Sequence, residues 1–139
     1  MKATLHLYPG RHIHEVQHEF SEAYPFLRIE FYKMQPAYSH MLVRKHLNHS
    51  VLLKMAGLKN PGFLKIEDKM TVAELENILL DQFGLHAQVT RQSGIIWLET
   101  TMTDDWTLRQ QNEHGKEITN GAGGYTSPED FDLTRGVSD

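Results

Sequence analysis

The feature that most constrains this chain is a strand–helix–strand pattern at residues 63–91, FLKIEDKMTVAELENILLDQFGLHAQVTR. At both ends of the stretch, apolar and polar side chains alternate, which is the period of a half-buried β-strand. Between them, Thr71 and Glu74 have the spacing of a capping box, which predicts that a helix begins there. Gly84 predicts the end of that helix, because glycine adopts the left-handed conformation without steric cost. The apolar stripe of the helix comprises Val72, Leu75, Ile78, Leu79 and Phe83.

The same pattern occurs once before, 59 positions earlier, at residues 4–33. His12 and Glu15 stand where the second copy has Thr71 and Glu74. One residue is lost at the end of the helix, so the last strand matches at an offset of 58. We interpret the two stretches as an internal repeat of a βαβ unit. The matching apolar pairs are Leu5 with Leu64, Leu7 with Ile66, Ile13 with Val72, Val16 with Leu75, Phe20 with Leu79, and Tyr24 with Phe83.

Two βαβ units in one chain predict an α+β domain with the ferredoxin-like order βαββαβ. In that arrangement all strands share one sheet, each crossover is right-handed, and both helices cover the same face. The other face of the sheet is then open. The strands are expected at residues 3–8, 26–33, 63–67 and 85–89, and the helices at residues 11–24 and 71–83.

The segment between the units, residues 34–62, leaves its conformation open. Residues 41–43 fit either a short edge strand or a turn of helix. Asn48 or Ser50 could cap a short helix that ends at Gly57.

After the second unit, residues 92–94 predict a hairpin turn and residues 95–100 a fifth strand, which is an addition to the four-strand pattern. This strand is apolar on both faces. One face can enter the core, and the other, with Trp97, needs a cover. The last helix, expected at residues 105–113, is the simplest cover, and a partner protein is the alternative.

Thr103 or Asp104 is expected to cap that last helix, and Gly115 to end it. From residue 116 onward the chain is rich in glycine, serine, threonine and aspartate. These residues bury little apolar surface, so residues 116–139 are expected to form a flexible acidic tail. Residues 1–115 are then a single domain.

Composition narrows the classes of function. The 139 residues include no cysteine, which excludes disulfides, thiol catalysis and thiolate metal sites. No apolar run is long enough to cross a bilayer, and no secretion signal is recognised, so a cytoplasmic protein without membrane association is expected. No nucleophile motif or glycine-rich phosphate loop is found. We therefore expect no catalytic residue and no cofactor.

Nine histidines raise the question of a metal site. His14 and His18 are four residues apart on the first helix, which brings both rings to one face. The apolar stripe lies elsewhere on that helix, so both side chains are expected in solvent, and spacing supplies no third ligand. Asp104 and Asp105 form a carboxylate pair, but their place at a helix start indicates capping. The prediction is that the chain has no metal site.

Charge is unevenly distributed along the chain. The net charge is −4, yet no aspartate or glutamate occurs between Phe31 and Ile66. This basic segment includes Arg44, Lys45, Lys54 and Lys59, as well as Lys33 and Lys65.

The open sheet face is the candidate binding surface. Outward aromatic and basic side chains on a four-stranded sheet are how RNA-recognition modules stack bases. Against that function, the aromatic RNA-binding motif of such modules is absent and the isoelectric point is about 6.1. The candidate binding residues are His6, Tyr8, Arg28, Tyr32, His86 and Trp97.

Two further stretches carry a resemblance. Residues 97–101 (WLETT), 103–108 (TDDWTL) and 111–112 (QN) resemble the C-terminal part of a family of small, uncharacterised bacterial proteins. Residues 22–27 (EAYPFL) and 29–31 (IEF) are similar to its N-terminal part. The resemblance covers most of residues 3–113 and implies a free-standing bacterial domain, with no activity or ligand attached.

The leading hypothesis is a non-enzymatic binding or interaction module. It would use the open sheet face or a sheet edge, and a homodimer is one form it could take. The first alternative is binding of single-stranded RNA through the same face and the basic segment. A weaker alternative is a small enzyme in which His6 or His86 is a base.

Overall fold

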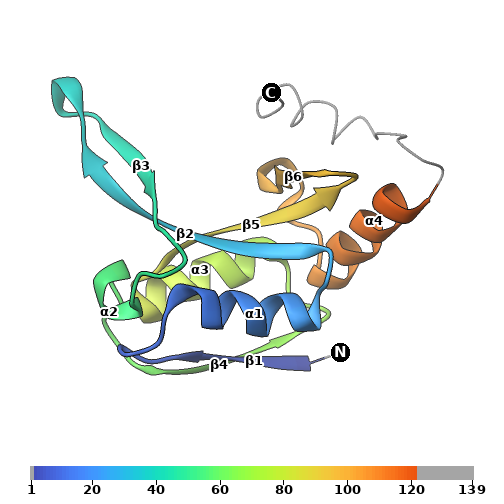
Figure 1. The fold of residues 1–139 in the computed structure, drawn as a ribbon, viewed down its shortest axis with the longest axis horizontal. Coiled ribbons are helices and arrows are strands. Elements are labelled where there is room, and N and C mark those ends of the chain that lie inside the picture. The colour runs from blue at the N-terminus through green and yellow to red at the C-terminus, as the bar shows by residue number, and fades with distance from the viewer. Residues whose placement is uncertain (1, 122–139) are drawn as a thin grey trace.

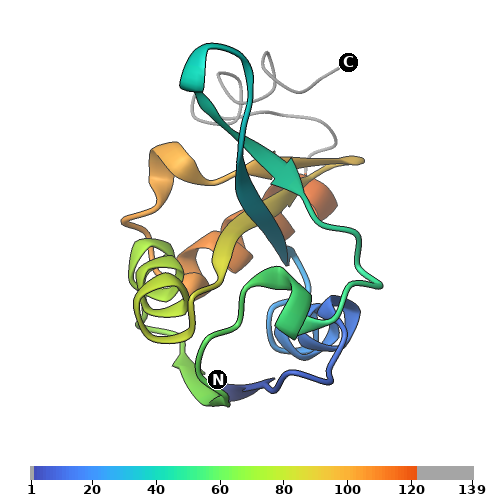
Figure 2. The ribbon, with the colours of Figure 1, turned by 90° about the vertical axis from the view of Figure 1, so that its left-hand side faces the viewer.

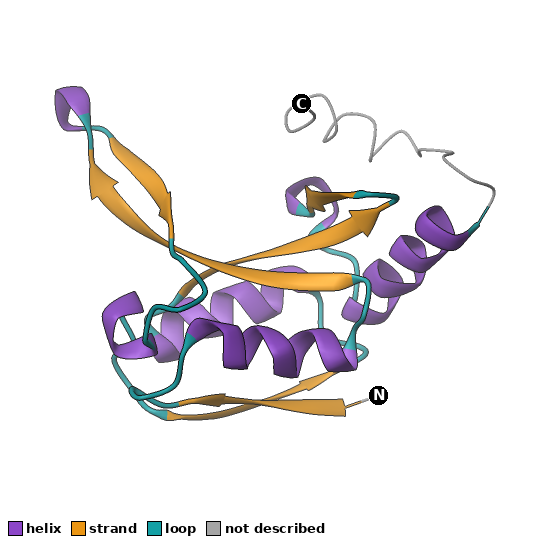
Figure 3. Cartoon of the chain, in the orientation of Figure 1, coloured by secondary structure: helices purple, strands orange, loops and turns teal. Residues whose placement is uncertain are grey.

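The computed structural model describes residues 2–121 and has an α+β fold with two antiparallel sheets. Two helices, α1 (Ile13–Ala23) and α3 (Val72–Phe83), form a middle layer (Figure 1). A two-stranded sheet lies on one side of this layer and a four-stranded sheet on the other (Figure 2). The helices are therefore covered on two sides by strands, as the colouring by secondary structure makes visible (Figure 3).

Each βαβ unit contributes one strand to each sheet. The two-stranded sheet pairs β1 (Lys2–Leu7) with β4 (Gly62–Glu67), and these two strands run antiparallel. The four-stranded sheet pairs β2 (Leu27–Pro36) with β5 (His86–Ser93) at its centre. A helix thus links two strands that never pair with each other.

The strand register relates the two units closely. Leu5 lies opposite Leu64 in one sheet, and Glu30 lies opposite Gln88 in the other. These are positions that the offsets of 59 and 58 in the sequence make equivalent. A local two-fold axis through both pairs would give this register, while the internal repeat stays a prediction.

The ferredoxin-like arrangement is not confirmed, because the strands form two sheets instead of one. The middle segment explains the difference. Its strand β3 (Leu42–His46) occupies one edge of β2, and β5 occupies the other. β4 then pairs with β1 on the far side of the helices. Among the described strands no pair is parallel, so the expectation of right-handed crossovers does not apply.

The capping prediction for α3 is confirmed. The Glu74 amide donates to the Thr71 hydroxyl at 3.1 Å, and the Thr71 amide donates to the Glu74 carboxylate at 2.8 Å. Gly84 ends the helix with φ +77°, in the left-handed region. The carbonyl oxygen of Gly57 would lie only 2.8 Å from a Cβ atom on Gly84, so the end of α2 (Leu53–Ala56) meets the end of α3 closely.

The hydrophobic core lies between the sheets and the helix layer. The apolar stripes of both helices are buried, together with the inward side chains of the strands. The fully buried members include Leu5, Leu7, Ile13, Val16, Phe20, Leu27, Ile29, Ile66, Val72, Leu75, Leu79, Leu85 and Val89. The predicted stripes are therefore the ones that pack.

The middle segment forms a hairpin that leaves the body of the domain. β2 continues past its pairing with β5 and turns through a short 3₁₀ helix, Tyr38–His40, into β3. We call residues 33–46 the arm. All of its residues are exposed, and it projects away from the layers (Figures 1 and 2). Of the two conformations that the sequence left open for residues 41–43, the strand is the one found.

The C-terminal helix differs from its prediction in both bounds. α4 spans Leu108–Asn120 and begins with a capping box between Thr107 and Gln110. The expected caps do not cap the helix, because Thr103 belongs to a 3₁₀ turn, Thr101–Thr103, and Asp104 ends that turn. Gly115 does not end the helix but lies within it, where an ideal Cβ would be 3.0 Å from side-chain atoms of Arg91 and Phe26.

Gly115 is thus a packing residue that lets α4 approach β5. Residues 116–120 of the expected tail belong to this helix, and residues 122–139 lie outside the described part of the chain. Within residues 2–121, no helix is long and apolar enough to span a membrane.

Candidate functional site

The outer face of the four-stranded sheet is the face turned away from α1 and α3. Its side chains follow from the register of β2, β5 and β6 (Ile96–Glu99), since inward residues such as Ile29 and Val89 face the helices. The outer face comprises Arg28, Glu30, Tyr32, His86, Gln88, Thr90, Trp97 and Glu99. Four of the six predicted binding residues meet on it.

Arginine–aromatic contacts organise this face. The guanidinium of Arg28 lies 4.0 Å from the ring centroid of Trp97. That of Arg44 lies 4.5 Å from the ring of Tyr32, which in turn lies 5.3 Å from the ring of His86. Each cation is attracted by the negative face of its ring. The rings are therefore already stacked on the protein's own arginines.

Arg44 also ties the arm to the sheet. It projects from β3 across β2, donating to the side-chain oxygen of Gln88 at 3.2 Å and to Glu99 at 3.5 Å. Gln88 is only 4% exposed although it lies on the outer face. Arg44 was predicted as part of a basic segment. In the structure it also joins the arm to the outer face through Gln88, Glu99 and the Tyr32 ring.

The arm combines exposed apolar side chains with positive charge. Tyr38 is 92% exposed and Met41 is 63% exposed, far above what a core residue shows. Lys33, Arg44 and Lys45 supply the charge, and the arm has no carboxylate. The other exposed apolar side chains of the arm are Met34, Leu42 and Val43. A β-strand with both faces in solvent is an unusual use of apolar residues.

β3 is also the edge strand of its sheet, in the order β3-β2-β5-β6. An edge strand has backbone groups that can pair with another strand, and proteins normally protect such edges. The arm therefore offers both a strand edge and apolar side chains to a binding partner. Sequence reasoning missed the arm as a unit. Its only signal was the alternating stretch on either side of Pro36-Ala37, which is typical of a hairpin.

Glu76 of α3 supports the sheet beside this face. Its carboxylate accepts a hydrogen bond from the Val89 amide at 2.9 Å. Val89 is the β5 residue next to Thr90, where the pairing of β5 with β6 ends. Burial raises the pKa of Glu76 to about 7, although the Val89 hydrogen bond lowers it. Asp104 and Glu99 add to the rise, and Arg44 opposes it. Nothing in the sequence pattern distinguished this glutamate from its neighbours on the helix.

The two remaining predicted binding residues lie elsewhere. His6 is in β1 and Tyr8 directly follows that strand, so both lie at the two-stranded sheet and not at the four-stranded one. The prediction of one shared face was wrong because the strands form two sheets. The His6 ring lies 2.7 Å from Glu19, which also contacts Arg11 at 3.0 Å. Burial raises the pKa of Glu19, but hydrogen bonds from His6 and Arg11 outweigh it and leave the pKa below its usual value.

The basic segment is likewise divided. Arg44 and Lys45 lie on the arm, whereas Lys54 lies in α2 and Lys59 in the loop after it. The Lys59 side chain packs against Gly84, at the end of α3. The basic segment is therefore divided between the arm and the region of α2.

Trp97 is not covered by the last helix. α4 packs on the inner side of the sheet, where Gln111 accepts from Arg91 at 2.6 Å. Leu98, on that side, is fully buried. Trp97 faces outward, is half-buried, and is covered by Arg28.

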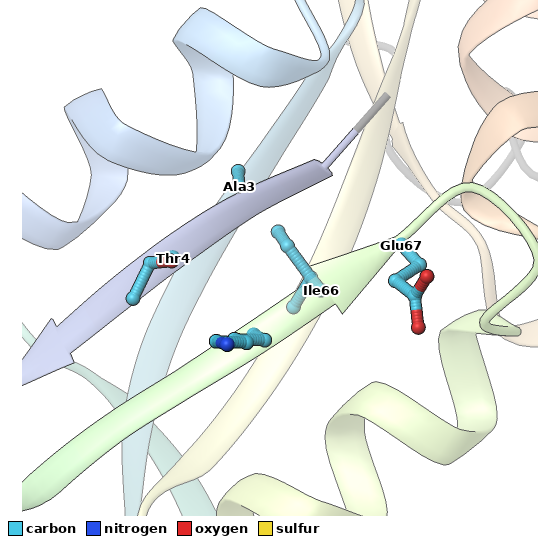
Figure 4. A pocket seen from close by; sticks show the side chains of 5 residues that line it. Ala3, Thr4, Ile66 and Glu67 are labelled. Atoms are coloured by element: carbon cyan, nitrogen blue, oxygen red, sulfur yellow. The ribbon is translucent and has the colours of Figure 1, made fainter.

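The hollow beside the two-stranded sheet has a volume of about 310 Å³ and is lined by Ala3, Thr4, Lys65, Ile66 and Glu67. Its side chains are spread along both strands and do not converge on one point (Figure 4). Catalytic groups need hydrogen-bond contact with a reacting atom, which such a spread does not favour. This hollow therefore gives no support to an enzymatic site.

The histidines near α1 contact one another or a carboxylate. The rings of His12 and His14 are stacked, with centroids 5.1 Å apart, and His14 meets His49 edge-on at 6.0 Å. His18 pairs with Glu22 at 3.3 Å. In the part of the chain that the structure describes, no group of three or more metal-binding side chains is arranged to hold a metal ion.

A comparison of the chain with protein-family models, curated proteins and solved structures finds no match. The resemblance to a bacterial family therefore stays a prediction.

Proposed function

We propose that this chain is a non-enzymatic binding module whose arm and outer face hold an acidic, partly apolar segment of a partner protein. The observation that carries the proposal is the arm. It has five exposed apolar side chains, three cations and no carboxylate, and within residues 2–121 no helix packs on it. Exposed apolar residues on such a scale favour an interaction surface.

The mode of binding that fits best is strand addition to β3. The partner's backbone would pair with the free edge of β3, while its alternate side chains contact the arm. Acidic side chains of the partner would face Lys33 and Lys45. Apolar ones would cover Leu42 on the opposite face of the arm, which is 60% exposed. Self-association of two chains through the same edge is the closest variant of this proposal.

The second candidate function is binding of single-stranded RNA. The observation that favours it is the pair of arginine–aromatic stacks on the outer face, which are groups that bases stack on. Two facts weaken it. The rings are already occupied by guanidinium groups, and the net charge of the chain is −4.

The test is a pair of titrations of ¹⁵N-labelled protein followed by NMR. One probe is a ten-residue peptide of alternating aspartate and leucine, and the other is a single-stranded oligouridylate of similar length. We expect the peptide to shift the amides of residues 42–46 and the oligouridylate to leave them unchanged. A peptide of alternating lysine and leucine is the control for charge. Shifts with the oligouridylate alone would reverse the ranking of the two functions.

Light scattering across concentration separates the self-associating variant. A mass that rises to twice 16.1 kDa, together with loss of the rise in Leu42→Glu, would assign the edge to a second copy. A constant mass leaves the edge to a different partner.

A further inference from the structure

The described chain ends beside the four-stranded sheet. α4 runs to Asn120, and the Gly94 amide, in the turn between β5 and β6, donates to the Thr119 hydroxyl at 3.2 Å. Trp97 follows that turn by three residues, with Arg28 stacked on it. The segment that follows, residues 122–139, therefore starts at one border of the outer face, and the arm stands at the opposite end (Figure 1).

The composition of residues 122–139 complements that of the arm. The segment has four carboxylates and a single cation, whereas the arm has three cations and no carboxylate. Both contain apolar residues among their charges. The carboxylates are Glu129, Asp130, Asp132 and Asp139, and the apolar residues include Tyr125, Phe131 and Leu133.

We infer that residues 122–139 bind the arm of the same chain and compete there with the partner. This inference rests on the proposed function, because it assigns the same surface an intramolecular occupant. The segment has the chemistry proposed for the partner, acidic and partly apolar. It would act as a built-in competitor that lowers the affinity of the module.

The length of the segment is sufficient. Gly94 lies three residues beyond Arg91, which pairs with Leu27, so the sheet covers about 30 Å from Gly94 to Lys33 at ~3.4 Å per residue. Asp132 lies eleven positions after Gly121, and a fully extended chain of that length spans about 37 Å. The Asp132 carboxylate can therefore reach Lys33 and Lys45 at the base of the arm.

Tethering makes even a weak contact effective. A short connection gives an effective concentration in the millimolar range, so a contact with a millimolar dissociation constant is formed about half the time or more. The apparent affinity for the partner is the intrinsic affinity multiplied by the fraction of arms left free. We expect neutralisation of the segment, in Glu129→Gln/Asp130→Asn/Asp132→Asn, to tighten binding of the aspartate–leucine peptide by about twofold or more.

The direct test uses paramagnetic broadening in the full-length chain. Because the sequence has no cysteine, Ser127→Cys provides a single site for a nitroxide label. We expect the label to broaden the amides of residues 33–35 and 43–46 more than those of β1 and β4. The broadening should decrease at high salt, which screens the charges, and in the neutralised variant. A label at Lys65→Cys, on the far sheet, is the control for random encounters.

The outcomes separate this inference from the proposed function. Broadening confined to the arm supports the inference. Uniform broadening, with a peptide that still binds the arm, overturns the inference and leaves the proposed function standing. If neither the segment nor the peptide reaches the arm, both are wrong. Broadening that appears only when labelled and ¹⁵N-enriched chains are mixed would assign the contact to a second copy, which also overturns an intramolecular occupant.

Discussion

β2 and β5 are paired at the centre of the larger sheet, and each continues past the other at one end. The extension of β5 is covered: Ser93 is 8% exposed and Arg91, the last residue paired with β2, is fully buried, because α4 packs against this end of the strand. In the described part of the chain, no helix packs against the extension of β2, and every residue from Lys33 to His46 is exposed. One extension became part of the core, and the other became the arm.

The comparison shows that strand pattern alone does not decide which surface is free. Both extensions alternate in the way that strands do. What differs is the element that follows in the chain, a helix with a glycine at its contact in one case and a hairpin in the other. A surface available to partners is therefore found where no described helix or strand packs over the sheet. Four changes test this difference, in decreasing order of expected effect.

The largest effect on stability is expected at Gly115, where α4 approaches β5 most closely. Gly115→Val places a branched side chain where a Cβ alone would lie 3.0 Å from Arg91 and Phe26. We expect the free energy of unfolding to fall by about 3 kcal/mol, since overpacking a tight contact forces backbone shifts. Urea denaturation measures it. Gly10→Val is the matched control, because no atom lies within 4 Å of a Cβ there. Equal stability of the two variants would show that α4 does not hold the β5 extension.

The second effect depends on pH. The pKa of Glu76 is raised to about 7 by burial, so the folded state holds this proton more tightly than the unfolded state. Its contribution to stability is then present below about pH 4.5 and is lost as the pH rises through 7. Glu76→Gln keeps an acceptor for the Val89 amide and removes the charge. We expect it to match the wild type near pH 4.5 and to be more stable by about 2 kcal/mol at pH 8.

The measurement is chemical denaturation of both proteins at several pH values, with the exposed Glu117→Gln as the control. A variant less stable than the wild type at pH 8 would contradict the sign of the prediction.

The third effect concerns the start of α3, in the layer that both sheets share. Thr71→Ala removes the hydroxyl that accepts from the Glu74 amide, and we expect a loss of about 1 kcal/mol. Thermal unfolding followed by circular dichroism is a suitable measurement. Thr101→Ala, at an exposed position, should be neutral by comparison. If both variants lose the same stability, the capping box contributes nothing specific.

The smallest effect is expected on the arm. Leu42→Ser should change the free energy of unfolding by less than about 0.5 kcal/mol, because Leu42 is 60% exposed. Binding of the aspartate–leucine peptide should nonetheless weaken measurably. Leu27→Ser, at a fully buried position of the same sheet, is the contrasting variant and should be strongly destabilised. A large loss of stability from Leu42→Ser would mean that the arm packs against the body after all.

Local signals in the sequence predicted the elements of the two units well. The Thr71 capping box, the Gly84 ending and the buried stripes of both helices follow from spacing and from backbone geometry, which neighbours in the chain determine. The topology did not follow from these signals, since the expected single sheet and the observed pair of sheets bury the same helix stripes. What distinguishes them is that β3 occupies the edge of β2, a contact that depends on the segment with the weakest pattern.

The candidate surface was predicted in part. Arg28, Tyr32, His86 and Trp97 share a face because alternation along each strand fixes which side chains point outward. The assignment of His6 to that face depended on the sheet being continuous, and it was wrong. Gly115 was assigned as a helix end, because a glycine needed for close packing looks the same in the sequence as one needed for a turn.

The pairing of β1 with β4, and of β2 with β5, joins residues about 60 positions apart along the chain. Neither unit can complete a sheet by itself, so during synthesis no central strand pair forms until β5 has left the ribosome. Folding that waits for distant contacts is slow, and the nascent first unit has apolar strands without partners. The same geometry makes the protein a natural split system. Two fragments divided within residues 57–61 should remain separately unfolded and should assemble when mixed.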